Sequence, residues 1–96
     1  MTKQLSDFRF TVNPETTASV HDDGIVILHI GNGRLYASNG MGARIWRGVE
    51  QQLSVVAIAE EVSGDQAITQ TSAREQVVHF LEELEQHGLV QRKAEL

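Results

Sequence analysis

Cysteine is absent from this chain of 96 residues, and its absence excludes several kinds of site and support. There is no disulfide to stabilise the fold, no thiol nucleophile and no thiolate metal ligand, and such a sequence suits a reducing compartment. No apolar run approaches the roughly 20 residues that a membrane-spanning helix needs. Residues 1–7 lack the apolar segment of a secretory signal. We therefore expect a cytoplasmic protein without a membrane partner.

The patterns of catalytic and metal sites are also missing. The four histidines form no H-x-x-H or H-E-x-x-H pair, the spacing by which ligands on one helix converge on a metal. No phosphate-binding loop, dinucleotide fingerprint or G-x-S-x-G motif occurs. The carboxylates fall in an expected turn or on expected helix faces, where water solvates them, whereas acid–base catalysis needs a desolvated cleft. We expect no enzyme activity, no metal and no cofactor.

Positive charge is scarce in the chain. Eight lysines and arginines stand against thirteen acidic residues, which gives a formal net charge of −5. The cations are spread along the sequence, so that a phosphate backbone would be repelled at long range. The composition therefore disfavours nucleic acid as a partner.

The first half of the chain predicts a small antiparallel sheet. Phe8, Phe10 and Val12 alternate with polar residues, which is typical of a half-buried strand. Two turn signals follow, Asp-Gly at residues 23–24 and Gly-Asn-Gly at 31–33, and they separate three β-prone segments. These segments are residues 17–21, 25–30 and 34–38. They predict a three-stranded meander.

The second half predicts three helices. We expect Asn39, Ser54 and Ser72 to be their N-caps, the last in an S-x-x-E capping box, with Gly64 and Gly88 ending the second and third. Apolar residues recur at helical spacing, namely Ala43, Ile45, Trp46 and Val49, then Val55, Ile58, Ala59 and Val62, then Val77, Phe80, Leu81 and Leu84. Residues 89–91 either pair as a short strand or cover the core. The expected fold is an α+β, winged helix-turn-helix domain over residues 1–96, frayed at 1–7 and 92–96.

This layout raises DNA binding as an alternative function. A recognition helix presents cations and amides to DNA, but the expected last helix carries Arg74 against four glutamates. Such a helix repels phosphate, and a fold of this kind does not by itself fix a function. A winged-helix regulator is therefore the second class of hypothesis.

The strand at residues 34–38 suggests a different function. It has no proline, no lysine and one charge, so little blocks its pairing if it lies at the edge of the sheet. An extended peptide can add to such an edge through main-chain hydrogen bonds, while pockets against a neighbouring helix give specificity. The alternative is that the N-terminal strand or a second copy covers the edge, which leaves a structural or dimerisation subunit as the third class.

Several segments together resemble a known family. They read D-G-I-V-I-L at 23–28, G-R-L-Y-A-S-N at 33–39, G-A-R-I-W at 42–46, and V-V-H-F-L-E-E-L at 77–84 with G-L-V at 88–90. Over residues 17–91 the chain resembles the PqqD-like proteins, also called precursor-peptide recognition elements of ribosomally synthesised, modified peptides. It looks most like the stand-alone leader-binding partner of lasso-peptide leader peptidases. PqqD proper, which serves a radical-SAM enzyme in quinone-cofactor synthesis, is the alternative.

The resemblance implies a site and a mode of binding. A leader peptide adds as an antiparallel strand to the third strand and lies in a groove beside the last helix. The chain itself does no chemistry and brings the precursor to a separate leader peptidase or modifying enzyme. Ser38 and Gln76 replace a leucine and an aspartate usual in the family, which trims apolar surface and removes one charge.

Periodicity adds the helix wall of this site. If Val77, Leu81 and Leu84 of the last helix face the core, then Ala73, Gln76 and Phe80 flank that stripe on one side. The pattern does not decide which flank faces the sheet edge, and we take this one. The expected peptide-binding residues are Arg34, Leu35, Tyr36, Ala37 and Ser38 on the strand, with Ala73, Gln76, Val77, Phe80 and Leu84 on the helix. Glu83 and Arg34 at the rim would select the charge of the leader.

Overall fold

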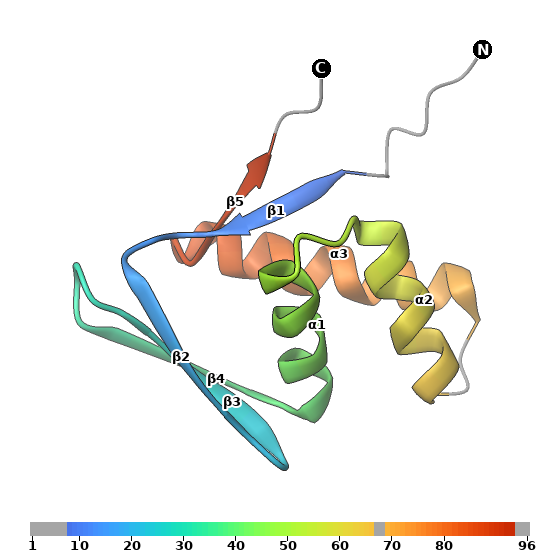
Figure 1. Cartoon of the computed structure of the whole chain (residues 1–96), viewed down its shortest axis with the longest axis horizontal. Coiled ribbons are helices and arrows are strands. Elements are labelled where there is room, and N and C mark those ends of the chain that lie inside the picture. The colour runs from blue at the N-terminus through green and yellow to red at the C-terminus, as the bar shows by residue number, and fades with distance from the viewer. Residues whose placement is uncertain (1–7, 67–68, 94–96) are drawn as a thin grey trace.

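The computed structural model describes residues 8–66 and 69–93 as an α+β fold (Figure 1). Its elements in chain order are β1 (Arg9–Val12), β2 (Thr16–His21), β3 (Gly24–His29), β4 (Arg34–Asn39), α1 (Gly40–Glu50), α2 (Val55–Gln66), α3 (Gln70–Gln86) and β5 (Val90–Lys93). Figure 1 shows the β2–β3–β4 sheet on one side of the molecule and the helices on the other. The predicted order of strands and helices is confirmed.

The predicted meander forms a sheet in the order β2-β3-β4, with both pairs antiparallel. The Asp22-Asp23 turn joins β2 to β3, and the loop at 30–33 joins β3 to β4. Ile25 and Ile27 of the central strand are buried against the helices, while Val26 between them is exposed. One face of this sheet therefore packs on the core, as the alternation of side chains along a strand requires.

A second sheet pairs the two ends of the described chain. β1 is antiparallel to β5, with Phe10 opposite Arg92, so the strand alternative for residues 89–91 is confirmed. The fraying expected from residue 92 is wrong for Arg92 and Lys93, because β1 fixes their backbone and the Arg92 guanidinium lies 4.4 Å from the centre of the Phe8 ring. Residues 1–7 and 94–96, also expected to fray, lie outside the described part.

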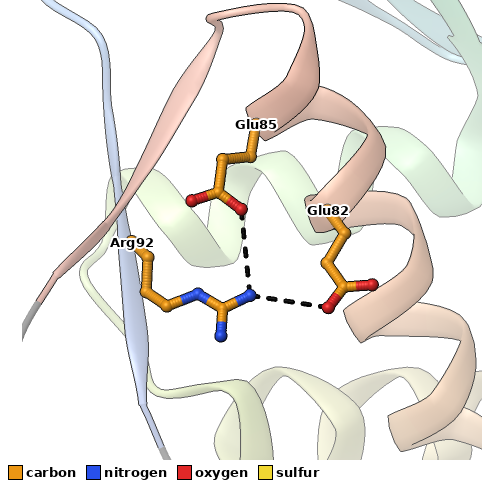
Figure 2. A network of polar contacts seen from close by, with 3 residues as sticks. All are labelled: Glu82, Glu85 and Arg92. Atoms are coloured by element: carbon orange, nitrogen blue, oxygen red, sulfur yellow. Dashed lines mark hydrogen bonds and ion pairs between the residues drawn. The ribbon is translucent and has the colours of Figure 1, made fainter.

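Arg92 also joins β5 to α3. Its guanidinium lies 3.5 Å from a carboxylate oxygen of Glu82 and 3.8 Å from one of Glu85 (Figure 2). All three side chains are more than a third exposed, so these ion pairs contribute little stability individually. Their geometry nevertheless holds the last strand against the outer face of the last helix.

The helix ends confirm some predicted caps and correct others. Asn39 and Ser54 are N-caps as predicted, their side chains accepting hydrogen bonds from the N–H groups of Gly42 (3.1 Å) and Ala57 (3.2 Å). The cap expected at Ser72 is wrong, because Thr69 has an extended backbone and its hydroxyl already accepts the Ser72 N–H at 3.0 Å. α3 therefore begins one turn earlier than predicted.

Two glycines were expected to end helices. Gly88 does follow the end of α3, with a φ of 77° that disfavours other residues. Gly64 does not end α2, which continues to Gln66. A glycine inside a helix costs only about 1 kcal/mol relative to alanine, which the flanking turns of α2 outweigh.

The core lies between the helices, β3 and the β1–β5 pair. Trp46 is 1% exposed and its indole N–H donates to the carboxylate of Glu50 at 3.0 Å. The buried apolar residues come from every element except β2 and β4. These two strands contribute partly buried side chains and remain the edges of their sheet.

Candidate functional site

β4 is an edge strand of the β2–β3–β4 sheet, which is the condition that strand addition at residues 34–38 requires. Ile30 donates its backbone N–H to Glu15 at 2.7 Å across the β2–β3 ladder. Ile30 therefore points its backbone groups toward β2. Because this direction alternates along an antiparallel strand, the backbone groups of Ile25, Ile27 and His29 point toward β4. No strand pairs with the other side of β4 within residues 8–66 and 69–93.

The same alternation decides which β4 groups face outward. Arg34, Tyr36 and Ser38 lie opposite the β3 residues that face β4, and their backbone groups complete that ladder. Leu35 and Ala37 therefore present their N–H and C=O groups to the open edge. Each can accept and donate one main-chain hydrogen bond to an added strand.

A groove of about 360 Å³ adjoins this edge. It lies between the end of β4, the first turns of α1 and the middle of α3. Its lining residues are Ser38, Asn39, Met41, Gly42, Ile45, Glu75, Gln76, His79 and Phe80. The apolar part comes from Met41, Ile45 and Phe80, and the polar rim comes from α3.

Gly42 makes this groove possible by its lack of a side chain. A Cβ at this position would overlap the side chain of Ser38 and lie 3.1 Å from Cζ of Phe80. The three elements therefore meet at the floor of the groove as closely as a backbone allows. Any larger residue at position 42 must displace β4 or α3.

Tyr36 links β4 to α3 beside the groove. Its ring is edge-on to Phe80, with the ring centres 6.2 Å apart, and lies 5.4 Å from the ring centre of His87. Burial raises the pKa of Tyr36, and the charge of Glu83 and a hydrogen bond to that carboxylate raise it further. The phenol of Tyr36 and the carboxylate of Glu83 are therefore electrostatically coupled across the β4–α3 contact.

The structure brings most of the predicted site together. Leu35 and Ala37 are exposed on the outer face of the sheet, while Tyr36 and Ser38 are half-buried on the face toward α3. Arg34 is exposed at the start of β4. Gln76 and Phe80 line the groove.

Three predicted wall residues need correction. Ala73, Val77 and Leu84 are fully buried in the core, with no exposed surface to offer a ligand. Together with Leu81 they form the stripe of α3 that packs inward. Ala73 belongs to this stripe rather than to its flank, because it precedes Val77 by one helical turn.

Six lining residues were not among the predicted ones, namely Asn39, Met41, Gly42, Ile45, Glu75 and His79. Glu75 and His79 adjoin Gln76 and Phe80 on α3, so the period of that helix was sufficient to find them. Met41 and Ile45 come from α1 and reach the groove because α1 turns back beside β4. The residues of α1 alone do not predict that this helix lies beside β4.

A metal cluster and a membrane-spanning helix have no counterpart among the residues that the structure describes. No group of three or more acidic or histidine side chains there is arranged to hold a metal ion. No helix of the described chain is long and apolar enough to span a membrane.

Comparisons with known proteins agree with this geometry. Residues 24–90 match the family model of coenzyme PQQ synthesis protein D (PqqD), and no curated protein sequence matches the chain. Two solved structures share the fold, described as "TbiB1 in Complex with the TbiA(beta) Leader Peptide" and "Lasso peptide synthetase B1 complexed with the leader peptide". The first has a TM-score of 0.81 at 20% identity, covering 88% of this chain and 99% of that one. The second has a TM-score of 0.78 at 21% identity, covering 85% and 96%.

The family match spans well over half of the chain and includes β3, β4 and all three helices, the elements that form the groove. The chain therefore belongs to the coenzyme PQQ synthesis protein D family.

Proposed function

We propose that this chain binds the leader segment of a ribosomally synthesised precursor peptide and presents it to a separate leader peptidase or modifying enzyme in lasso-peptide biosynthesis. The observation that carries the proposal is the open edge of β4 beside an apolar groove. The two structures of the same fold, each described as holding a leader peptide, support it.

The binding step is strand addition. The outward N–H and C=O groups of Leu35 and Ala37 pair with the backbone of the leader, each hydrogen bond contributing about 0.5–1.5 kcal/mol net. Every second side chain of the leader then points into the groove between β4 and α3. Backbone bonds supply affinity for any extended peptide, and the groove selects among sequences.

Presentation to the enzyme is an effect of proximity. Holding the leader on this single domain raises the local concentration of the rest of the precursor near a bound enzyme. The chain needs no catalytic group for this role, and we assign it no reaction. We place this work in the cytoplasm, where precursor peptides are synthesised.

A second candidate role follows from the family match. A chain of this family would act as a peptide chaperone for a radical-SAM enzyme in quinone-cofactor synthesis. The same groove and edge would bind the peptide in both roles, so the identity of the leader distinguishes them.

The winged helix-turn-helix layout belongs to this proposal as well. We interpret α2 and α3 as the helix pair and the β2–β4 sheet as the wing, used here for a peptide. The exposed side of α3 carries Glu75, Glu82 and Glu83, which disfavours a DNA-binding role for the pair.

A titration with matched proline variants tests the proposal. A labelled leader peptide, taken from the precursor encoded nearest to this chain, is titrated by fluorescence anisotropy. We expect saturable binding that Ala37→Pro weakens at least about tenfold, because one outward donor is lost and the proline ring blocks the approach.

The control is Ala18→Pro on β2. The N–H of Ala18 faces away from β3 at the other edge of the sheet, so this change perturbs a strand to the same extent without touching β4. Equal binding by wild type and a folded Ala37→Pro variant would sink the strand-addition model. A shift of duplex DNA at low salt would instead favour the regulator.

A further inference from the structure

We propose, resting on the function above, that the recognised leader carries an apolar residue followed two positions later by a lysine or arginine. The apolar side chain fills the groove beside Ser38, and the cation lies beside Tyr36 against Glu83. This pairing names the chemistry of the peptide that the site selects.

The spacing follows from the alternation of side chains in a sheet. Residues directly opposite each other in an antiparallel pair point to the same face. Leader residues opposite Tyr36 and Ser38 therefore face α3, while those opposite Leu35 and Ala37 bond through their backbone and point to the outer face. Because an antiparallel strand runs against β4, the residue opposite Ser38 comes first.

The position opposite Ser38 favours an apolar side chain. It faces the groove of about 360 Å³ whose apolar lining is Met41, Ile45 and Phe80. Gly42 forms the floor of this groove, where the side chains of Ser38 and Phe80 lie against the backbone of α1. A polar residue here would be desolvated against apolar surface without a partner.

The position opposite Tyr36 favours a cation. The Tyr36 ring contacts Phe80 and His87 of α3. Glu83 lies one turn from each of these on the same face of that helix, and its carboxylate raises the pKa of the phenol. A lysine or arginine stem can lie along the rings of Tyr36 and Phe80, which stand edge to face, with its charge against Glu83. Burial of the stem and the ion pair then act together.

The other charges near the groove narrow the choice to one position. Glu75 lies at the opposite end of the rim and adds to the negative potential. Arg34 is on the same face of β4 as Tyr36, two residues earlier, and repels a cation placed opposite itself. The leader position opposite Arg34 therefore disfavours a cation, and the position opposite Tyr36, next to Glu83, favours one.

Selection from a random library of displayed 12-residue peptides tests this inference without knowledge of the natural leader. Wild-type protein is compared with Glu83→Gln and, as a matched control, with Glu60→Gln on the exposed side of α2. We expect the wild type and the control to enrich an apolar residue followed at the second position by lysine or arginine. The Glu83→Gln variant should keep the apolar residue and lose the cation.

Synthetic peptides then measure the effect. A selected peptide should bind the wild type about threefold to tenfold more tightly than its lysine-to-glutamine version, and less than about twofold more tightly in Glu83→Gln. Enrichment without a cation at that spacing, or a cation preference that survives Glu83→Gln, overturns the inference alone. No enrichment above the Ala37→Pro variant overturns the proposed function and the inference with it.

Discussion

The two edges of the β2–β3–β4 sheet look alike in backbone but differ in what lies beside them. Both are unpaired in the described chain, and each adjoins a hollow next to α1. The hollow at β4 has an apolar wall from α3, whereas the one at β2, about 410 Å³, includes Asp22, Arg44 and Arg47. An open edge is therefore a general peptide template, and the helix beside it decides which peptide can use it.

Removing the apolar wall that Phe80 forms beside β4 should make the two edges of the sheet equally poor at binding a leader. We expect Phe80→Ala to weaken leader binding by about tenfold or more, because the groove loses its largest apolar surface and Tyr36 loses its ring partner. The matched change at the other edge is Val20→Ala, which shortens a side chain beside the β2 hollow. Binding by the second variant should stay within twofold of wild type in the same anisotropy titration. Equal losses in both variants would place the leader elsewhere.

Filling the floor of the groove should have the next largest effect. Gly42→Ala puts a Cβ against Ser38 and Phe80, so we expect a loss of about 1–3 kcal/mol in the free energy of unfolding and severalfold weaker leader binding. Gly40→Ala is the control, because a Cβ there meets no heavy atom within 4 Å. Urea unfolding followed by the fluorescence of the single tryptophan, buried Trp46, measures both variants. A tolerated Gly42→Ala would show that β4 and α3 can separate without loss.

The smallest expected effect concerns the hydrogen bond between Tyr36 and Glu83. The folded pKa of Tyr36 is raised by burial first and by Glu83 second. This interaction therefore stabilises the fold below about pH 10, the usual pKa of tyrosine, and is lost as pH rises through the raised pKa. The chain has one tyrosine, so phenolate absorbance reports it directly. Glu83→Gln should lower the pKa while Glu82→Gln leaves it unchanged, and an identical pKa in all three proteins would contradict the contact.

The sequence predicts the sheet well because its signals are local. Asp22-Asp23-Gly24 and Gly31-Asn32-Gly33 define both hairpins by turn chemistry. The sequence also shows that nothing in β4 blocks pairing, because the strand has no proline or lysine. That β4 lies at the edge of the sheet is known only from the structure. Local reasoning is weaker where two residues of similar chemistry compete, as Thr69 and Ser72 do for the cap of α3.

The parts that escape prediction depend on contacts distant in sequence. β5 is a strand because β1 pairs with it from the other end of the chain, and nothing in its own residues distinguishes it from a frayed end. Ala73 is buried although alanine suits either face of a helix. Three of the nine residues that line the groove come from α1, whose position beside β4 follows from packing rather than from pattern.

The ion pairs of Arg92 have a consequence for the field around α3. This helix carries four glutamates, and Arg92 contacts two of them, Glu82 and Glu85, on the side away from the groove. Glu75 and Glu83 lie on the groove side. Arg92 of the last strand therefore offsets the negative charge of α3 only on the side away from the groove, and not on the other side of the helix.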